Sequence, residues 1–412
     1  MLFRKIGKYI EEHLNTESNK VLIIDGARQI GKTFIIRHVA QKLYENYIEI
    51  NLLEDYEKNK LFLNTKTVED FYLQVSMLAG EKMHDKANTI IFLDEIQKVT
   101  DYQKVVDSLY IRKNVDIYIT GSNAYLLSGE LATLLSGRYV EINMLPLSFA
   151  EYCETRGSGN KDELFGEYLR RGGFPYAVIL GDDDDKLDMY FEGIYNTIIL
   201  KDIEERQKRR EDDPNKRKIT DIVLLKNISR FLAGSVGSPI AIKNIAAYIT
   251  SGGRKVSENT VSDYTEALTE PYVFYPAERF DVAGKQLLKT MPKYYIVDLG
   301  IRRHLLPRKH YDLGFSLENI IFFELLRRGY KVYIGKVGST EVDFVAKKNE
   351  RVHYFQVTAS MTEESTFERE IRPLRSIDDN YRKTILTLDR LTIGDYEGIE
   401  VANAVDWLLA RE

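Results

Sequence analysis

The sequence predicts an α/β protein whose N-terminal part is built on a parallel β-sheet, and three observations support this. An apolar run that ends at Ile24 is followed by the glycine-rich stretch Gly26–Thr33 and then by a helical pattern. Thr89–Glu95 (TIIFLDE) is a short, continuous apolar run that ends in two acids, which is typical of a buried parallel strand. Between them lie a strand pattern at Tyr47–Leu52 and a helical pattern at Val68–Ala79.

The composition is that of an ordinary globular protein. The 412 residues permit two to four domains, and 44% of them are hydrophobic and 29% charged. No apolar run approaches the roughly 18 residues of a membrane span, so we expect no membrane association. The formal net charge of −5 gives no overall attraction to nucleic acid, so any such binding must come from local patches.

The single cysteine, Cys153, excludes a disulfide or a cysteine metal cage within one chain. The first residues contain acids and a helical period instead of the apolar run of a signal peptide. We therefore expect a cytoplasmic protein. Residues 1–19 read as an amphipathic helix with Ile6, Ile10 and Leu14 on one face, followed by a strand at Val21–Ile24.

Residues 26–33 fit the pattern GxxxxGK[ST], which defines a P-loop. In this motif the backbone N–H groups surround phosphates, Lys32 reaches the β- and γ-phosphates and Thr33 binds Mg²⁺. The helix that starts near Lys32 adds its positive dipole end. The alternative is a glycine turn in an α/β domain without a ligand. The expected nucleotide-binding residues are Gly26, Ala27, Arg28, Gln29, Ile30, Gly31, Lys32 and Thr33.

The acids that follow the apolar run, Asp94 and Glu95, predict a Walker B strand. A parallel strand delivers both side chains at its carboxyl end, where Asp94 can hold Mg²⁺ and Glu95 can orient and deprotonate a water molecule. Without the P-loop upstream, two acids in this place could instead open a loop or cap a helix.

A further strand at Asp116–Thr120 ends in Gly121-Ser122-Asn123, which predicts another polar side chain at the same sheet edge. Together with the P-loop and the acidic pair, this strand resembles the AAA-type branch of P-loop ATPases, where it carries the sensor 1 residue. The resemblance implies ATP and Mg²⁺ as ligands. It also implies that Asn123, or alternatively Ser122, contacts the γ-phosphate or the attacking water; we prefer Asn123 as the better donor.

The run Leu135-Ser136-Gly137-Arg138 and the following Leu145–Phe149 resemble bacterial and archaeal ATPases that join an AAA domain to a C-terminal domain of unknown function. By that resemblance Arg138 is a candidate arginine finger, which offers a planar charge to the transferred phosphoryl group. The alternative is an arginine in a surface salt bridge.

After Pro146 the pattern is helical, with helices expected at Phe149–Arg156, at Lys161–Arg171 and from about Lys186 to Arg206. This part is expected to form a helical lid. The acid run Asp182–Asp185 is more typical of a solvated helix start than of a metal site. The mixed charges of Gln207–Lys218 around a proline predict a domain linker.

Residues 219–280 resemble a winged helix, with helices at Ile219–Leu232, Ile240–Ile249 and Ser257–Glu270 and a small β-ribbon from Tyr272–Tyr275 onward. Such units often read the DNA major groove. The third helix, however, carries four acids and no lysine or arginine, so we expect a structural or protein-binding role instead of sequence-specific DNA reading.

The last part contains a helix through Glu318 and strands at Lys331–Gly335, Glu341–Ala346 and Val352–Thr358, and it resembles the restriction-endonuclease-like fold of PD-(D/E)xK nucleases. In that family an aspartate and a Glu-x-Lys hold Mg²⁺ and assist the nucleophile. Asp343 matches and Glu318 can serve as the helix carboxylate. Gln356 and Thr358, however, stand where the glutamate and the lysine are expected, although Lys336 or Lys347 could supply the charge. We therefore expect an inactive, degenerate site at Glu318, Asp343 and Gln356.

These patterns predict a P-loop ATPase with four parts: an AAA-type domain at 1–150, a helical lid and linker at 151–214, a winged-helix-like domain at 215–290 and a nuclease-like domain at 291–412. The expected function is ATP hydrolysis that drives a conformational change acting on a protein or nucleic-acid partner. An ATP-regulated, metal-dependent DNA nuclease is the alternative. The sequence leaves open which partner is bound and whether the chain forms a homo-oligomer.

Overall fold

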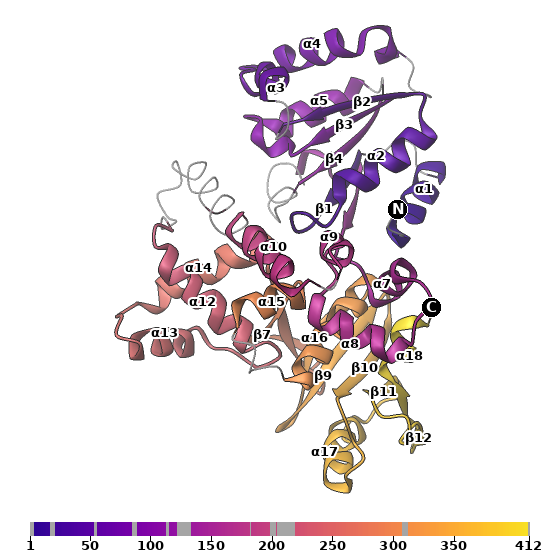
Figure 1. Ribbon diagram of the computed structural model, residues 1–412, viewed down its shortest axis with the longest axis vertical. Helices are drawn as coiled ribbons and strands as arrows, with labels where there is room; N and C mark the ends of the chain where they lie inside the picture. The colour runs from indigo at the N-terminus through magenta and orange to yellow at the C-terminus, as the bar shows by residue number, and fades with distance from the viewer. Residues whose placement is uncertain are drawn as a thin grey trace. The chain divides into compact units, whose positions relative to one another are not determined.

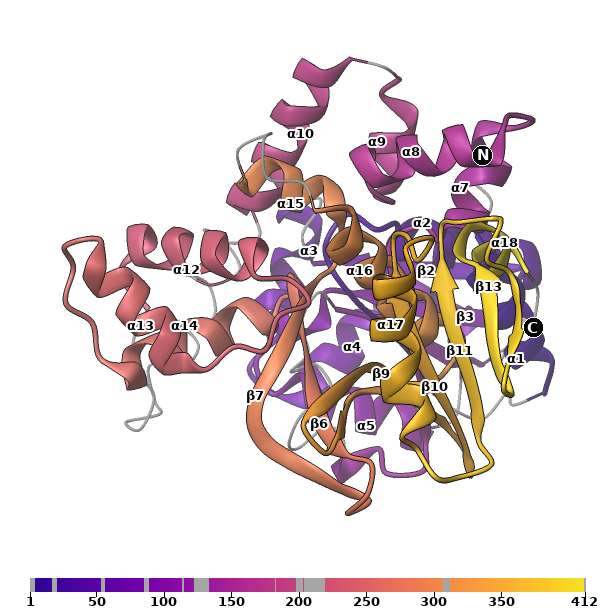
Figure 2. The ribbon, with the colours of Figure 1, turned by 90° about the horizontal axis from the view of Figure 1, so that it is seen from below.

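The structure is a computed structural model that describes residues 4–16, 21–52, 56–84, 89–112, 115–121, 133–181, 183–197, 203, 219–306 and 312–410. The chain divides into two compact units. Unit 1 comprises Met1–Leu145 together with Glu270–Tyr272, and unit 2 comprises Pro146–Thr269 together with Val273–Glu412. Figure 1 and Figure 2 show their elements from two directions.

Unit 1 is a parallel sheet with helices on its faces. Its strands are β1 (Val21–Asp25), β2 (Asn46–Asn51), β3 (Thr89–Asp94), β4 (Asp116–Thr120) and β5 (Tyr139–Asn143). Its helices are α1 (Lys5–Thr16), α2 (Lys32–Leu43), α3 (Tyr56–Leu63), α4 (Val68–Ala79) and α5 (Tyr102–Arg112), with short 3₁₀ helices η1 (Gly80–His84) and η2 (Ile96–Lys98). The expected α/β fold with a parallel sheet is confirmed.

The order of the unit 1 strands is β2-β3-β4-β1-β5, so β4 lies between the strand before the glycine-rich loop and the strand that ends in the acids. Strands β1 and β3 are buried along their whole length, as their continuous apolar runs predict. Helices α4 and α5 contribute Phe71, Val75 and Val106 to the core beneath the sheet. Figure 1 shows α2 on the opposite side of the sheet from α4 and α5.

Unit 2 begins with a group of helices and continues into a second sheet. Its helices are α7 (Phe149–Arg156), α8 (Lys161–Arg171), α9 (Pro175–Ile179), α10 (Asp184–Asn196), α12 (Ile222–Gly234), α13 (Ile242–Ser251), α14 (Glu258–Thr269), α15 (Leu299–Leu305), α16 (Leu313–Arg327), α17 (Glu364–Arg375) and α18 (Ala404–Leu409). Helices α7 and α8 have the bounds that the sequence predicts. The acid run serves as a helix start, because the Asp183 side chain accepts a hydrogen bond from the backbone N–H of Lys186.

The second sheet has eight strands in the order β12-β13-β11-β10-β9-β8-β6-β7. They are β6 (Phe274–Asp281), β7 (Gln286–Ile296), β8 (Lys331–Val337), β9 (Thr340–Lys348), β10 (Arg351–Thr358), β11 (Arg382–Thr387), β12 (Gly394–Tyr396) and β13 (Ile399–Asn403). Helix α17 lies over one face of this sheet (Figure 2), and its residues Ile371 and Leu374 belong to the buried core there. The three strands expected at 331–358 are confirmed.

The β-ribbon expected to complete a small winged helix belongs to this large sheet, which corrects the sequence-based prediction. Strand β6 pairs with β7 on one edge and with β8 on the other, so the ribbon continues the sheet of the C-terminal strands. Pairing both edges satisfies the backbone groups that a free edge strand would expose. Strand β7 also runs across position 290, where we expected one domain to end.

None of the described helices has the length and the apolar composition that crossing a bilayer requires. Two expected features lie outside the described residues: the linker Gln207–Lys218 and the end of the preceding helix near Arg206.

Candidate functional site

The carboxyl ends of four parallel strands form one row at an edge of the unit 1 sheet. Asn51 at the end of β2 is in register with Asp94 of β3, and Asp94 is in register with Thr120 of β4. Thr120 in turn pairs with Ile24 of β1, so the loop that follows β1 leaves the sheet at the same edge. The fold therefore brings the glycine-rich loop together with Asp94 and Glu95, which follow the loop by about seventy residues in the sequence.

Glycine is required at both ends of the loop. Gly26 has φ 135°, and a Cβ there would lie 2.2 Å from the carbonyl oxygen of Met144. Gly31, the residue before α2, has φ 92°, and Gln29 between them has φ 60°. Such backbone angles are strained for residues other than glycine. The loop can therefore curl closely over the chain that follows β5.

Lys32 lies inside this loop, with only 7% of its surface exposed. Its Nζ donates to the carbonyl oxygens of Gly26 at 2.8 Å and Ala27 at 2.7 Å. Burial lowers the pKa of Lys32, while the nearby carboxyl groups of Glu95, Asp94 and Asp25 act in the opposite direction. The loop thus holds the buried Lys32 ammonium against its own backbone carbonyls. Because this ammonium has lost its water, an anionic group near it is strongly favoured.

Helix α2 begins at this lysine. Gly31 occupies the N-cap position, so the backbone N–H groups of the first turn receive no side-chain cap. The positive end of the helix dipole and these donors therefore add to the charge of Lys32. Helix starts of this kind accommodate phosphate groups.

Asp94 accepts hydrogen bonds from three side chains around it. Its Oδ2 accepts hydrogen bonds from the Thr33 hydroxyl at 2.9 Å and from the Asn51 amide at 2.9 Å, and its Oδ1 accepts one from the Thr120 hydroxyl. Asp94 is 4% exposed, and burial raises its pKa, although the Thr120 hydrogen bond opposes this shift. The carboxylate is therefore held in one orientation beside the P-loop threonine.

Glu95 follows with an unusual backbone conformation. Its φ of 59° lies in the left-handed region, which non-glycine residues seldom adopt and which is often associated with functional sites. Its Oε2 accepts a hydrogen bond of 2.6 Å from the amide of Gln97 in η2. The strained turn directs the Glu95 backbone out of strand β3 immediately after Asp94.

The donors present in this part of unit 1 fit a nucleotide bound with a divalent cation. A buried lysine and a helix start suit phosphate oxygens, and a threonine hydroxyl beside a carboxylate suits Mg²⁺, which prefers oxygen ligands. The close approach at Gly26, which a Cβ would block, shows that the loop geometry itself depends on the glycines of the motif.

Comparisons with known proteins agree with this geometry. The model of a family described as AAA domain matches residues 18–153. A second family, described as Domain of unknown function (DUF8612), matches residues 162–312. A Haemophilus influenzae protein described as uncharacterized is 38% identical over 402 residues, which cover 95% of this chain and 95% of that protein. The chain belongs to the family of this Haemophilus protein. The N-terminal part of the present chain is an AAA domain.

The chain is also similar to an archaeal protein. An uncharacterized protein of Methanocaldococcus jannaschii is 28% identical over 422 residues and covers 95% of this chain and 88% of its own length. Among solved structures, a Walker-type ATPase of Pyrococcus abyssi is 17% identical, with a TM-score of 0.49, over 74% of this chain and 96% of that one.

The remaining predicted residues of the AAA domain are Asn123, Ser122 and Arg138. Asn123 and Ser122, expected at the end of β4, lie outside the described residues. Arg138 directly precedes β5, whose first residue pairs with the first residue of β1. This is the amino edge of the sheet, roughly 16 Å along the strand from the P-loop edge. The guanidinium of Arg138 is 3.2 Å from Asp107 and about half exposed, so the structure does not bring it to the P-loop of its own AAA domain.

Unit 2 brings together the residues of the expected degenerate site. Glu318 lies on α16, Asp343 on β9 and Gln356 on β10. The backbone N–H of Asp343 donates to Gln356 Oε1 at 3.3 Å, and the Gln356 amide donates to Glu370 of α17 at 2.9 Å. Neither Lys336 nor Lys347 enters this cluster through a described ion pair, and the Lys347 ammonium lies 3.3 Å from the centre of the Phe280 ring.

A different lysine, Lys293 of β7, fills the cluster. Its side chain is 3% exposed, and its Nζ lies 2.8 Å from Glu341, 3.1 Å from Glu318 and 3.7 Å from Asp343. One ammonium cannot neutralise three carboxylates, of which Glu318 is buried and Glu341 and Asp343 are partly exposed, so proton uptake at one of them is favoured. Burial, together with the neighbouring Glu318 carboxyl group, raises the pKa of Asp343 to about 8. The position between the carboxylates is occupied by the protein's own cation.

The sequence reasoning missed several of these residues. Asn51 and Thr120 are polar residues at the carboxyl ends of apolar strands, the same signal that identified Asp94, and they could have been found by it. Lys293 could not have been found from its neighbours in the sequence. Its strand enters the eight-stranded sheet beyond β6, and only that pairing places it against α16 and β9.

Proposed function

We propose that this protein binds ATP with Mg²⁺ and hydrolyses the nucleotide, and that the nucleotide cycle drives a conformational change that acts on a protein or nucleic-acid partner. The AAA domain and the arrangement of its P-loop support this proposal. The observation that carries it is the hydrogen bond from the Thr33 hydroxyl to buried Asp94, because it links the phosphate-binding loop to the acidic strand end.

Binding depends on the P-loop residues. Lys32 exchanges its bonds to the loop carbonyls for bonds to the β- and γ-phosphates, and the N–H groups at the start of α2 complete the cradle. Thr33 and Asp94 hold Mg²⁺, and Asn51 and Thr120 keep the Asp94 carboxylate oriented. When bound, Mg²⁺ neutralises charge that develops on the phosphate oxygens.

Hydrolysis depends on Glu95. Its carboxylate orients the attacking water and accepts a proton from it, and Gln97 holds one carboxylate oxygen in place. We also propose that Asn123 contacts the γ-phosphate or this water, because it follows the strand that lies between β1 and β3. These roles divide the site into residues that bind and residues that act on water.

A nucleotide-binding experiment tests the proposal. We expect ATP to bind in a Mg²⁺-dependent manner, measured by titration calorimetry, and Lys32→Ala to abolish binding. Lys42→Ala is the matched control, because Lys42 lies on the same helix and pairs with Glu11 at the surface. If Lys32→Ala binds ATP as the control does, the assignment of the P-loop is wrong.

In unit 2 we propose a winged-helix-like group formed by α12, α13 and α14, followed by a nuclease-like sheet. Val261, Tyr264 and Leu268 of α14 are buried, whereas its acids Glu258 and Glu266 are exposed. Glu270, the fourth acid expected on this helix, follows α14 and is buried. This distribution favours contact with a protein over reading of DNA. We do not propose the nuclease alternative as a function, because Lys293 occupies the carboxylate cluster and Gln356 is neutral.

A further inference from the structure

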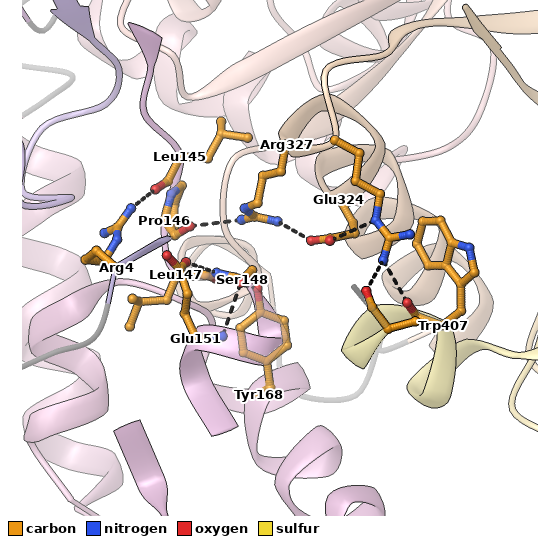
Figure 3. A network of polar contacts seen from close by, with 12 residues as sticks. Arg4, Leu145, Pro146, Leu147, Ser148, Glu151, Tyr168, Glu324, Arg327 and Trp407 are labelled. Carbon is orange, nitrogen blue, oxygen red and sulfur yellow. Dashed lines mark hydrogen bonds and ion pairs between the residues drawn. The ribbon is translucent and has the colours of Figure 1, made fainter. Parts of the chain in front are cut away.

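Arg4 connects the P-loop to Leu145, the last residue of the N-terminal segment of unit 1. It lies just before α1, and its two terminal nitrogens donate to two carbonyl oxygens: Nη1 to Ile30 at 2.9 Å and Nη2 to Leu145 at 2.7 Å. Figure 3 shows Arg4 beside Leu145. No motif of the sequence includes this arginine. A guanidinium can serve two acceptors at once because its donors form a rigid fork.

Both carbonyls belong to segments that matter for the nucleotide site. Ile30 is part of the P-loop, between Gln29 and Gly31, which both have positive φ angles. Leu145 follows β5 in the segment on which the loop rests, since the Met144 N–H donates to the carbonyl oxygen of Asp25 at 2.8 Å. A movement of the P-loop therefore changes the acceptor geometry of Arg4.

Helix α1 holds Arg4 in place. The Gly7 N–H donates to the carbonyl oxygen of Arg4 at 3.1 Å, which begins the helix. Gly7 packs closely against Ile35 of α2, since a Cβ on Gly7 would lie 3.0 Å from the Ile35 Cδ1 atom. Arg4 is thus anchored to the helix that follows the P-loop as well as to the loop itself.

The residues after Leu145 are fixed within unit 2, as Figure 3 shows. Arg327 of α16 donates to the carbonyl oxygen of Pro146 at 2.9 Å, and the hydroxyl of Tyr168 donates to that of Leu147 at 2.7 Å. The Leu147 N–H donates to the Gly173 carbonyl oxygen at 2.7 Å. Proline also restricts the backbone of the residue before it. The backbone of residues 146 and 147 is therefore held by hydrogen bonds within unit 2.

We infer that Arg4 is a positioning residue of the P-loop that transmits its nucleotide state to the segment 145–148, an inference that rests on the proposed ATP binding. Bound phosphate fixes the P-loop backbone, including the Ile30 carbonyl. Because Arg4 donates to both the Ile30 and the Leu145 carbonyl oxygens, fixing the first also restrains the second. The next carbonyl, that of Pro146, is held by Arg327, so the constraint reaches the first residues of unit 2 through the chain itself.

Hydrogen–deuterium exchange of the full chain tests this inference. The Glu95→Gln background prevents turnover, and ATP·Mg²⁺ is the probe. In this parent we expect ATP to slow exchange in the P-loop and also at the Leu147 amide by about threefold or more. With Arg4→Ala added, protection of the P-loop persists but the ATP-dependent slowing at Leu147 is lost.

Arg4→Lys is the second variant, because an ammonium retains the charge but not the rigid fork. It is expected to fold as the parent does and to lose most of the effect at Leu147. Arg112→Ala is the control, since Arg112 pairs with Glu69 on α4 and is expected to behave as the parent. Undiminished slowing at Leu147 in both Arg4 variants overturns the inference. A parent without ATP protection in the P-loop contradicts the proposed function itself.

Discussion

Two buried lysines, Lys32 and Lys293, show how the same side chain serves different ends. Among the described residues, the Lys32 ammonium donates to two neutral carbonyl oxygens of its own loop, which phosphate oxygens can replace as acceptors. Lys293 is surrounded by carboxylates from α16 and β9, so its charge is already compensated. Burial lowers the pKa of Lys32, whereas the carboxylates around Lys293 outweigh its burial and raise its pKa. The first lysine is arranged to bind a ligand, and the second takes the place of one.

We predict that Lys293→Ala destabilises unit 2 by about 3–5 kcal/mol, because it leaves buried carboxylates without their cation. A divalent cation should replace the lost charge, so Mn²⁺ should raise the melting temperature of the variant and not that of the wild type. Thermal unfolding with and without Mn²⁺ measures both effects.

Lys331→Ala is the control for this prediction, since Lys331 is an exposed lysine on β8 of the same sheet. It should neither destabilise the protein nor create a response to Mn²⁺. A wild type that Mn²⁺ stabilises as strongly as it does the Lys293 variant would show that Lys293 does not occupy the position of a metal.

At the scale of elements, the P-loop depends on its packing against the end of β5. We predict that Gly26→Ala destabilises unit 1 by roughly 2–4 kcal/mol and abolishes ATP binding, because the added Cβ meets the backbone oxygen of Met144, which cannot move aside like a flexible side chain. Urea unfolding and calorimetric titration with ATP measure the two effects.

Gly80→Ala separates steric overlap from backbone strain. Gly80 also has a positive φ, 58°, but a Cβ there would meet nothing within 4 Å. It should cost only about 1 kcal/mol, the strain of its backbone. Equal losses in the two variants would mean that contact with Met144 does not shape the loop.

The sequence predicted elements well where one local pattern determined them. Strand β4 and helix α4 have the predicted bounds, since apolar runs and helical spacing are properties of neighbouring residues. The P-loop and Asp94 were predicted for the same reason. The pairing of β6 with β8 was not predicted, because strand pairing depends on contacts between residues far apart in the sequence.

The same limit applies to the residues that support each site. Strands β11–β13 were not predicted, and β12, with three residues, is too short to show a strand pattern. Arg4 precedes the P-loop by more than twenty residues and contacts carbonyl oxygens, which every residue possesses, so no side-chain pattern could indicate its role. Motifs reveal groups that act on a ligand, whereas an orienting group such as Arg4 is found only in the fold.

At the scale of the whole molecule, the position of Arg138 bears on whether copies of the chain assemble with one another. It lies at the amino edge of the sheet, away from the P-loop of its own domain, and is about half exposed. If it is an arginine finger, it must act on the nucleotide of a neighbouring copy. The alternative is that its ion pair with Asp107 is an ordinary surface salt bridge, worth little to stability.

We predict that ATPase activity per chain rises with protein concentration and that Arg138→Ala lowers kcat by about 10³-fold with little change in ATP affinity. The exposed Arg112, paired with Glu69, provides the control variant Arg112→Ala. Steady-state kinetics over a range of protein concentrations measures both. Normal turnover by the Arg138 variant would return this residue to the role of a surface salt bridge.

Phosphate release by the full chain tests most directly whether the residues at the carboxyl edge of the unit 1 sheet hydrolyse ATP, as proposed. We predict Mg²⁺-dependent phosphate release by the wild type. Glu95→Gln should bind ATP with unchanged affinity and release phosphate at least about 100-fold more slowly, because its amide cannot accept the proton of water. Equal rates in wild type and variant, or no release by the wild type at any concentration, would contradict the account.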